Sequence, residues 1–207
     1  MLQSNSTINS WIGMILNKSI EEKSITRNFF HFPIKISNYS LYFLISAILG
    51  SILLIISAKI KVPLYPVPMT LQPLAVLLIG MLFGRNLAAA TVGLYILQGI
   101  LGLPVFAYGG GFMYLFGPTG GFIIGFLVSA IILGSLADRD WGKNLFLSLL
   151  CMIIGLFIIY FFGILQLSIM KGFDFAIIKG FFPFIIGDLY KLLLAGLLIP
   201  QIWKLTK

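Results

Sequence analysis

Charged side chains are scarce in this sequence. Only 10% of its 207 residues are Asp, Glu, Lys or Arg, whereas 59% are hydrophobic and the mean hydropathy is +1.07. A soluble domain carries about a quarter charged residues, so this composition excludes an ordinary soluble protein. We therefore predict an all-α membrane protein whose length suits one compact bundle of helices.

Groups for covalent or metal chemistry are nearly absent as well. The chain has one cysteine, Cys151, inside an apolar run, and one histidine, His31, near the N-terminus. The sequence therefore offers no disulfide, no zinc-ligand cluster and no nucleophile with a base beside it. The Gly-rich stretch YGGGFMYLFGPTGG lacks the Gly-Lys-Ser/Thr ending of a P-loop. We predict that the chain is not an enzyme and has no cofactor. If it moves a solute uphill, the energy must come from a partner or an ion gradient.

Acidic residues are the rarer of the two charges, with six Asp and Glu against 14 Lys and Arg. In a membrane protein this excess indicates topology and contact with anionic lipid, not binding of nucleic acid. With both termini inside, the cytoplasmic basic residues would be Lys18, Lys23, Arg27, Lys35, Arg85, Arg139, Lys143, Lys204 and Lys207. The outside set would be Lys59, Lys61, Lys171 and Lys179. This bias predicts a multi-pass protein of the cytoplasmic membrane with both termini cytoplasmic.

The chain divides into a tail, residues 1–39, and a membrane domain, residues 40–207. The tail has no long apolar run and no small-residue cleavage site, so we predict no signal peptide. An interfacial helix with an apolar side is one interpretation of the tail, and a loosely ordered segment is another. That apolar side would consist of Trp11, Ile12, Met14, Ile15 and Leu16.

Six membrane-spanning helices are predicted. Crossing the hydrocarbon takes about 20 apolar residues, a length met or nearly met by four segments. These are Leu41–Lys59, Gly120–Ala137, Leu145–Met170 and Phe184–Trp203. Two shorter segments, TLQPLAVLLIGMLFG and NLAAATVGLYILQGILG, flank a predicted turn at residues 84–86 and would form a helical hairpin.

The loops that flank the predicted hairpin are rich in proline and glycine. KVPLYPVPMT contains Pro63, Pro66 and Pro68, and GLPVFAYGGGFMYLFGPTGG contains two prolines and seven glycines. Because the hairpin helices are short, these loops must dip inward. Irregular backbone at membrane depth survives only when it is buried in protein or lines a cavity. We predict re-entrant loops on the extracytoplasmic side that form the walls of a pocket.

Two ionisable residues interrupt the last apolar run, FFPFIIGDLYKLLLAGLLIP. Asp188 and Lys191 are three residues apart, so they project from one side of a helix and can nearly touch. Ionised groups are costly at membrane depth, which makes them candidates for a functional site. The alternatives are a pair that only neutralises itself, or a Lys191 that extends to the interface. Because both irregular loops end at the same depth and side, we favour a site.

The predicted pocket combines aromatic walls with a few polar groups, the composition of a small-molecule site. Its aromatic residues would be Phe106, Tyr108, Phe112 and Tyr114, and its polar residues Thr70, Gln72, Tyr95 and Gln98. Two alternatives remain for these residues. Tyr95 and Gln98 could satisfy each other between helices, and Tyr114 could belong to an interfacial aromatic belt.

The first predicted helix also carries a strip of small residues, Ser46, Ala47, Gly50 and Ser51. Such strips allow helices to approach closely in lipid. The strip could contact a partner protein or pack within the bundle, and the sequence does not separate these roles.

Four motifs in order resemble the BioY family: VPLYPVPMTLQPLAVLLIGMLFG, GLYILQGILGLPVFA, GPTGGFIIGF and FFPFIIGDLYKLL. The resemblance covers roughly Ser40 to the C-terminus. Members are biotin-binding S components of energy-coupling factor transporters. The resemblance implies a six-helix bundle that captures biotin near the outer surface. It also implies a transmembrane coupling subunit and two ABC ATPase subunits as partners.

The resemblance further assigns Asp188 and Lys191 to the biotin site, and small residues of the first helix to contact with the coupling subunit. Asp188 can accept hydrogen bonds from the ureido N–H groups of biotin, while Lys191 can donate to the ureido carbonyl or balance the carboxylate. Some members carry a basic residue after the Leu-Pro-Val-Phe motif, but this chain has none between Arg85 and Arg139. An S component for another vitamin, and a small membrane enzyme or assembly scaffold, remain alternatives.

Overall fold

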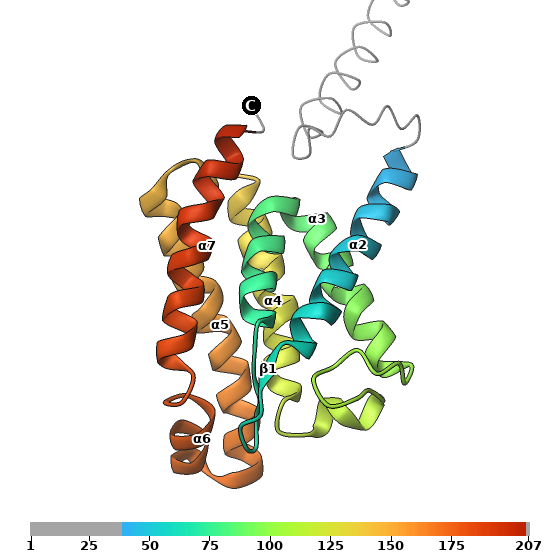
Figure 1. The fold of residues 1–207 in the computed structure, drawn as a ribbon, viewed down its shortest axis with the longest axis vertical. Helices are drawn as coiled ribbons and strands as arrows, with labels where there is room; N and C mark the ends of the chain where they lie inside the picture. The colour runs from blue at the N-terminus through green and yellow to red at the C-terminus, as the bar shows by residue number, and fades with distance from the viewer. Residues whose placement is uncertain (1–38, 206–207) are drawn as a thin grey trace, which may run out of the picture.

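The computed structural model describes residues 39–205 (Figure 1). Its helices are α2 (Tyr39–Lys59), α3 (Gln72–Ile100), α4 (Gly120–Ala137), α5 (Leu145–Lys171), α6 (Phe173–Gly180) and α7 (Ile185–Leu205). Strands β1 (Lys61–Val62) and β2 (Met69–Thr70) form a small antiparallel sheet, and η1 (Phe112–Phe116) and η2 (Trp141–Lys143) are 3-10 turns. The interfacial helix considered for the tail lies outside the described residues.

Five of these helices are long and apolar enough to cross a membrane, namely α2, α3, α4, α5 and α7. The predicted bounds of α4 agree with the structure. Those of α2 and α5 differ by one or two residues at one end, and those of α7 differ at both ends. The count differs from the predicted six because α3 runs as one element through the predicted turn. The eight-residue helix α6 was not predicted.

Helix α3 is broken at Gly84, the first residue of the predicted turn. Gly84 has φ 70° and ψ 173°, a conformation that favours glycine. A Cβ atom at this position would also collide with the Asp138 carboxylate. Figure 1 shows the two arms of α3 bending over at one end of the bundle. The break therefore gives the two arms different directions within one continuous element.

The small-residue strip of α2 packs against α3. Ala47, Gly50 and Ser51 are buried, and Ser46 is half-buried. A Cβ atom on Gly50 would lie 2.6 Å from Thr91 Cγ2 of α3. The exposed side of α2 carries large aliphatic residues instead: Leu41, Leu44, Ile45, Ile48, Leu49, Ile52, Leu53 and Ile56. The strip therefore packs within the bundle, and contact with a partner protein stays a prediction.

Replacing Gly50 with leucine should destabilise the bundle. The added side chain has to displace Thr91 and Phe83, whose Cε2 atom would lie 2.9 Å from the new Cβ. Overpacking of this kind costs about 1–3 kcal/mol, which should lower the melting temperature in detergent. Gly93→Leu is the matched control, because a Cβ on Gly93 meets nothing within 4 Å. Equal melting temperatures for the two variants would contradict close packing of α2 on α3.

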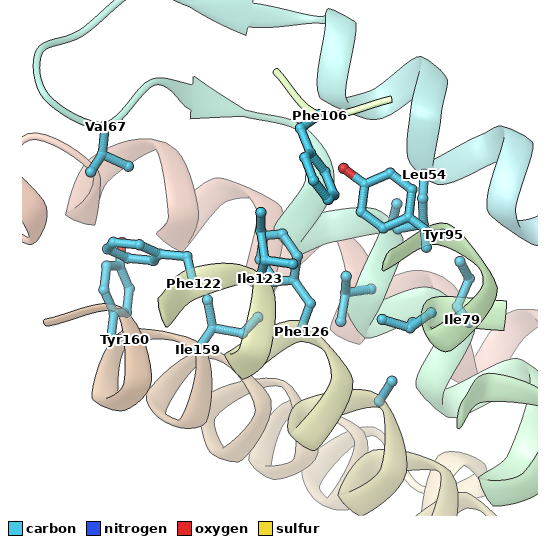
Figure 2. Packing of buried hydrophobic residues seen from close by; sticks show 14 of the residues in the cluster. Leu54, Val67, Ile79, Tyr95, Phe106, Phe122, Ile123, Phe126, Ile159 and Tyr160 are labelled. Atoms are coloured by element: carbon cyan, nitrogen blue, oxygen red, sulfur yellow. The ribbon is translucent and has the colours of Figure 1, made fainter. Parts of the chain in front are cut away.

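Buried hydrophobic residues form two clusters along the bundle. One cluster lies toward the end that carries β1, β2, η1 and α6, which we call the loop end (Figure 1). Figure 2 shows its members Phe122, Ile123 and Phe126 on α4 beside Ile159 and Tyr160 on α5. The other cluster contains Leu77, Met81, Leu133, Met152, Ile199 and Trp203. The candidate site lies within the first cluster.

Candidate functional site

A cavity opens among the aromatic residues of the loop end. Its empty volume is about 540 Å³, a value that includes the open mouth. Small-molecule sites typically have mostly apolar walls with a few placed polar groups. The lining residues are Val67, Pro68, Thr70, Gln72, Pro73, Phe106, Ala107, Tyr114, Thr119, Phe122, Ile123, Phe126, Ile159, Tyr160, Phe184, Asp188 and Lys191. The cavity is therefore a largely apolar space with its polar groups concentrated on a few residues.

The predicted ionic pair lies in the wall of this cavity. Asp188 and Lys191 are on the first turns of α7, and they are only 4% and 9% exposed. Lys191 Nζ lies 2.6 Å from Asp188 Oδ1 and donates to the Thr70 carbonyl over 2.7 Å. The two residues are thus each other's counter-ions and cavity-lining groups at the same time. The contact with Thr70 also ties α7 to strand β2.

Tyr160 completes the environment of the carboxylate, and sequence analysis missed it. Its hydroxyl donates to Asp188 Oδ2 over 2.5 Å, so each carboxylate oxygen has one partner. Tyr160 lies within the apolar run LFIIYFFGIL of α5. Its hydroxyl is the only polar side-chain group in that run, and a buried tyrosine usually has a hydrogen-bond partner. A single hydroxyl in an otherwise apolar run was therefore the sequence feature that could have indicated Tyr160 as a site residue.

Gln72 and Thr70 line the cavity as predicted, whereas Tyr95 lies behind them. Gln72 Nε2 donates to the Tyr95 hydroxyl over 2.7 Å, and the Thr70 hydroxyl donates to Gln72 Oε1 over 3.3 Å. The Tyr95 hydroxyl donates to the carbonyl of Val105 over 3.4 Å. Tyr95 is fully buried and does not line the cavity, so it acts by orienting the Gln72 amide.

Two of the four aromatic residues predicted for the pocket line this cavity. Phe106 and Tyr114 line the cavity, with ring centroids 4.8 Å apart. Tyr108 and Phe112 do not line it and are 54% and 57% exposed. Gln98 is also outside the lining, and its Oε1 atom is buried without a hydrogen-bond partner among the described residues. Gly109 and Gly111 next to these two residues have positive φ angles, a backbone conformation that residue spacing alone did not indicate.

Comparisons with known proteins place these features in context. The model of the BioY family matches residues 32–207. A protein of Thermotoga maritima named "Biotin transporter BioY" is 39% identical over 164 residues, which cover 78% of this chain and 96% of the relative. A "Probable biotin transporter BioY" of Pyrococcus horikoshii is 39% identical over 66% of this chain and 80% of the relative.

A solved structure has the same fold. It is a 2.1 Å crystal structure described as "the S-component for biotin from an ECF-type ABC transporter". The TM-score is 0.72, and the match covers 82% of this chain and 94% of the other. The identity is 24%, so this likeness supports the architecture of the bundle.

Proposed function

The chain belongs to the BioY family, and from this membership we propose that it is the biotin-binding S component of an ECF-type importer. Relatives that match over most of their length are named biotin transporters. The family consists of transport proteins, so its members are not enzymes, in agreement with the sequence prediction. Biotin is then the transported substrate and not a cofactor.

The observation that carries this proposal is the hydrogen-bonding capacity left on the ionic pair. A carboxylate has about four acceptor positions and an ammonium has three donors. Tyr160 and Lys191 occupy two acceptor positions of Asp188, while Asp188 and the Thr70 carbonyl occupy two donors of Lys191. Two acceptor positions and one donor remain. The ureido group of biotin offers two N–H donors and one carbonyl, which is the complementary set.

The apolar walls suit the rest of the proposed ligand. Phe122, Phe126 and Ile159 present hydrocarbon surface to the same cavity that contains the ionic pair. Burial of a thioether ring and an alkyl chain against such walls is favourable by about 25 cal/mol per Å². Polar groups at one end would orient the guest, and the remaining surface would cover it.

We also propose the finer topology. The break at Gly84 would let the two arms of α3 cross the membrane separately, giving six crossings with both termini in the cytoplasm. The loop end would then be extracytoplasmic, where its irregular backbone around Pro68 and Ala107 lines the cavity. Irregular backbone of this kind is compatible with membrane depth because protein covers it.

The proposed partners follow from the energy requirement. The sequence has no P-loop, so ATP hydrolysis must take place on other subunits. We propose that a transmembrane coupling subunit and two ABC ATPases supply that work in the cytoplasmic membrane. The solved structure with the same fold is an S component of an ECF-type ABC transporter, which supports this arrangement.

The purified protein should bind biotin and no other vitamin. We expect biotin alone to raise the melting temperature in a thermal-shift screen over vitamins, because a ligand that binds only the folded state stabilises it. Tritiated biotin should also bind and be displaced by excess unlabelled biotin. Stabilisation by a different vitamin would assign the chain to another substrate, and binding of none of them would contradict the proposed function.

A further inference from the structure

Lys61 does not line the cavity itself, but the register of the small sheet places it opposite a residue that does. Strand β1 pairs with β2 so that Lys61 is directly opposite Thr70. Side chains directly opposite in an antiparallel pair share one face of the sheet. Thr70 lines the cavity, so the Lys61 side chain projects from the face of the sheet that is directed toward the cavity.

The ammonium group of Lys61 extends to a second segment of the cavity wall. It donates to the carbonyl of Ala107, which lines the cavity, and lies 3.7 Å from the ring centroid of Tyr108. One of its three donors is therefore engaged by the backbone, and two remain. Lys59 lies nearby but is exposed, and it donates to the carbonyls of Pro104 and Phe106. Lys61 is thus the less exposed of the two lysines, and its ammonium has more unused hydrogen-bond donors than that of Lys59.

The two ends of the cavity differ in charge. Lys191 is neutralised by Asp188, so the end formed by α7 has no net charge. Within residues 39–205, the two ion pairs present join Lys143 to Asp140 and Lys191 to Asp188. Lys61 therefore has no carboxylate partner in the described part of the chain. Its uncompensated positive charge, adjacent to a low-dielectric cavity, attracts an anion.

We propose that Lys61 binds the carboxylate of the ligand and makes the site select the anionic form of its substrate. This inference rests on the proposed function. With the ureido group on Asp188 and Lys191, the acidic tail points away from α7 toward the rim. Lys61 can make a charge-assisted hydrogen bond to the carboxylate there. The loop that follows Val105 cannot supply this cation, because it contains no Lys or Arg.

The test compares biotin with its uncharged methyl ester in binding to the purified protein. The wild-type chain should bind biotin about tenfold or more tightly than the ester, because a charge-assisted hydrogen bond is lost with the ester. Lys61→Gln should weaken biotin binding about tenfold and change ester binding less than about threefold. Lys61→Arg should keep most of the preference for biotin. Lys179→Gln is the matched control, since Lys179 is exposed on α6 and does not line the cavity.

Each outcome decides the role of Lys61. A loss of preference restricted to Lys61→Gln, with rescue by arginine, supports the carboxylate contact. Equal weakening of biotin and ester would mean that Lys61 only holds the loop at Ala107, and it would overturn the proposal. Unchanged binding of both would overturn it too. If the wild-type chain binds neither compound, the proposed function fails, and the role of Lys61 fails with it.

Discussion

Asp188→Asn should weaken biotin binding by about tenfold or more. The substitution keeps the shape of the side chain but removes its charge, and it leaves the Lys191 ammonium buried without a counter-ion. The amide must also turn an N–H group toward either Lys191 or the Tyr160 hydroxyl, where the carboxylate now accepts at both oxygens. Removal of one partner from a buried ion pair costs about 3–5 kcal/mol, so the dissociation constant and the melting temperature should be measured together.

Two further variants separate ligand binding from folding. Asp174→Asn makes the same chemical change at an exposed position of α6, and it should leave both quantities unchanged. Asp188→Leu combined with Lys191→Met removes the whole pair, which is often neutral for stability when apolar groups of similar volume replace it. A folded double variant should fail to bind biotin. Normal binding by that variant would show that Asp188 and Lys191 only neutralise each other and do not contact the ligand.

Most helices could be predicted from the sequence because long apolar runs end at charged or turn-forming residues. Helix α4 begins at Gly120 and ends before Asp138 and Arg139, and its predicted bounds agree with the structure. The break in α3 could also be located, since Gly84 precedes the polar residues of the predicted turn. The sheet could not, because its strands have two residues each and their pairing depends on a loop held by tertiary contacts.

The candidate site was only partly predictable, for a reason specific to membranes. A helix in lipid is apolar on every side, so hydrophobic periodicity does not reveal which face lines a cavity. Phe122, Ile123 and Phe126 of α4 line the cavity but look no different in sequence from the exposed Ile124 and Ile132. Charged and amide groups in apolar surroundings can still be recognised in the sequence. This is why Asp188, Lys191 and Gln72, which line the cavity, could be singled out as candidates.

Ile123→Trp should lower the affinity for biotin by about 100-fold or more, because the indole would occupy the space of the guest. Ile123 is 4% exposed and lines the cavity between Phe122 and Phe126, on the α4 face that Figure 2 shows toward Phe106. The added ring would enter the cavity that Ile123 lines. The melting temperature of the unliganded protein should therefore change little. Binding is measured with tritiated biotin on the purified variant.

Ile132→Trp is the matched control on the same helix. Position 132 is nine residues from position 123, and at about 100° per residue it faces the opposite side of α4. Ile132 is 37% exposed, so its indole would point away from the cavity and binding should stay normal. Should Ile123→Trp fail to fold, Ile123→Phe adds less volume and should still weaken binding measurably. Full affinity in a folded Ile123→Trp protein would place the ligand outside this cavity, because a guest and an indole cannot share one volume.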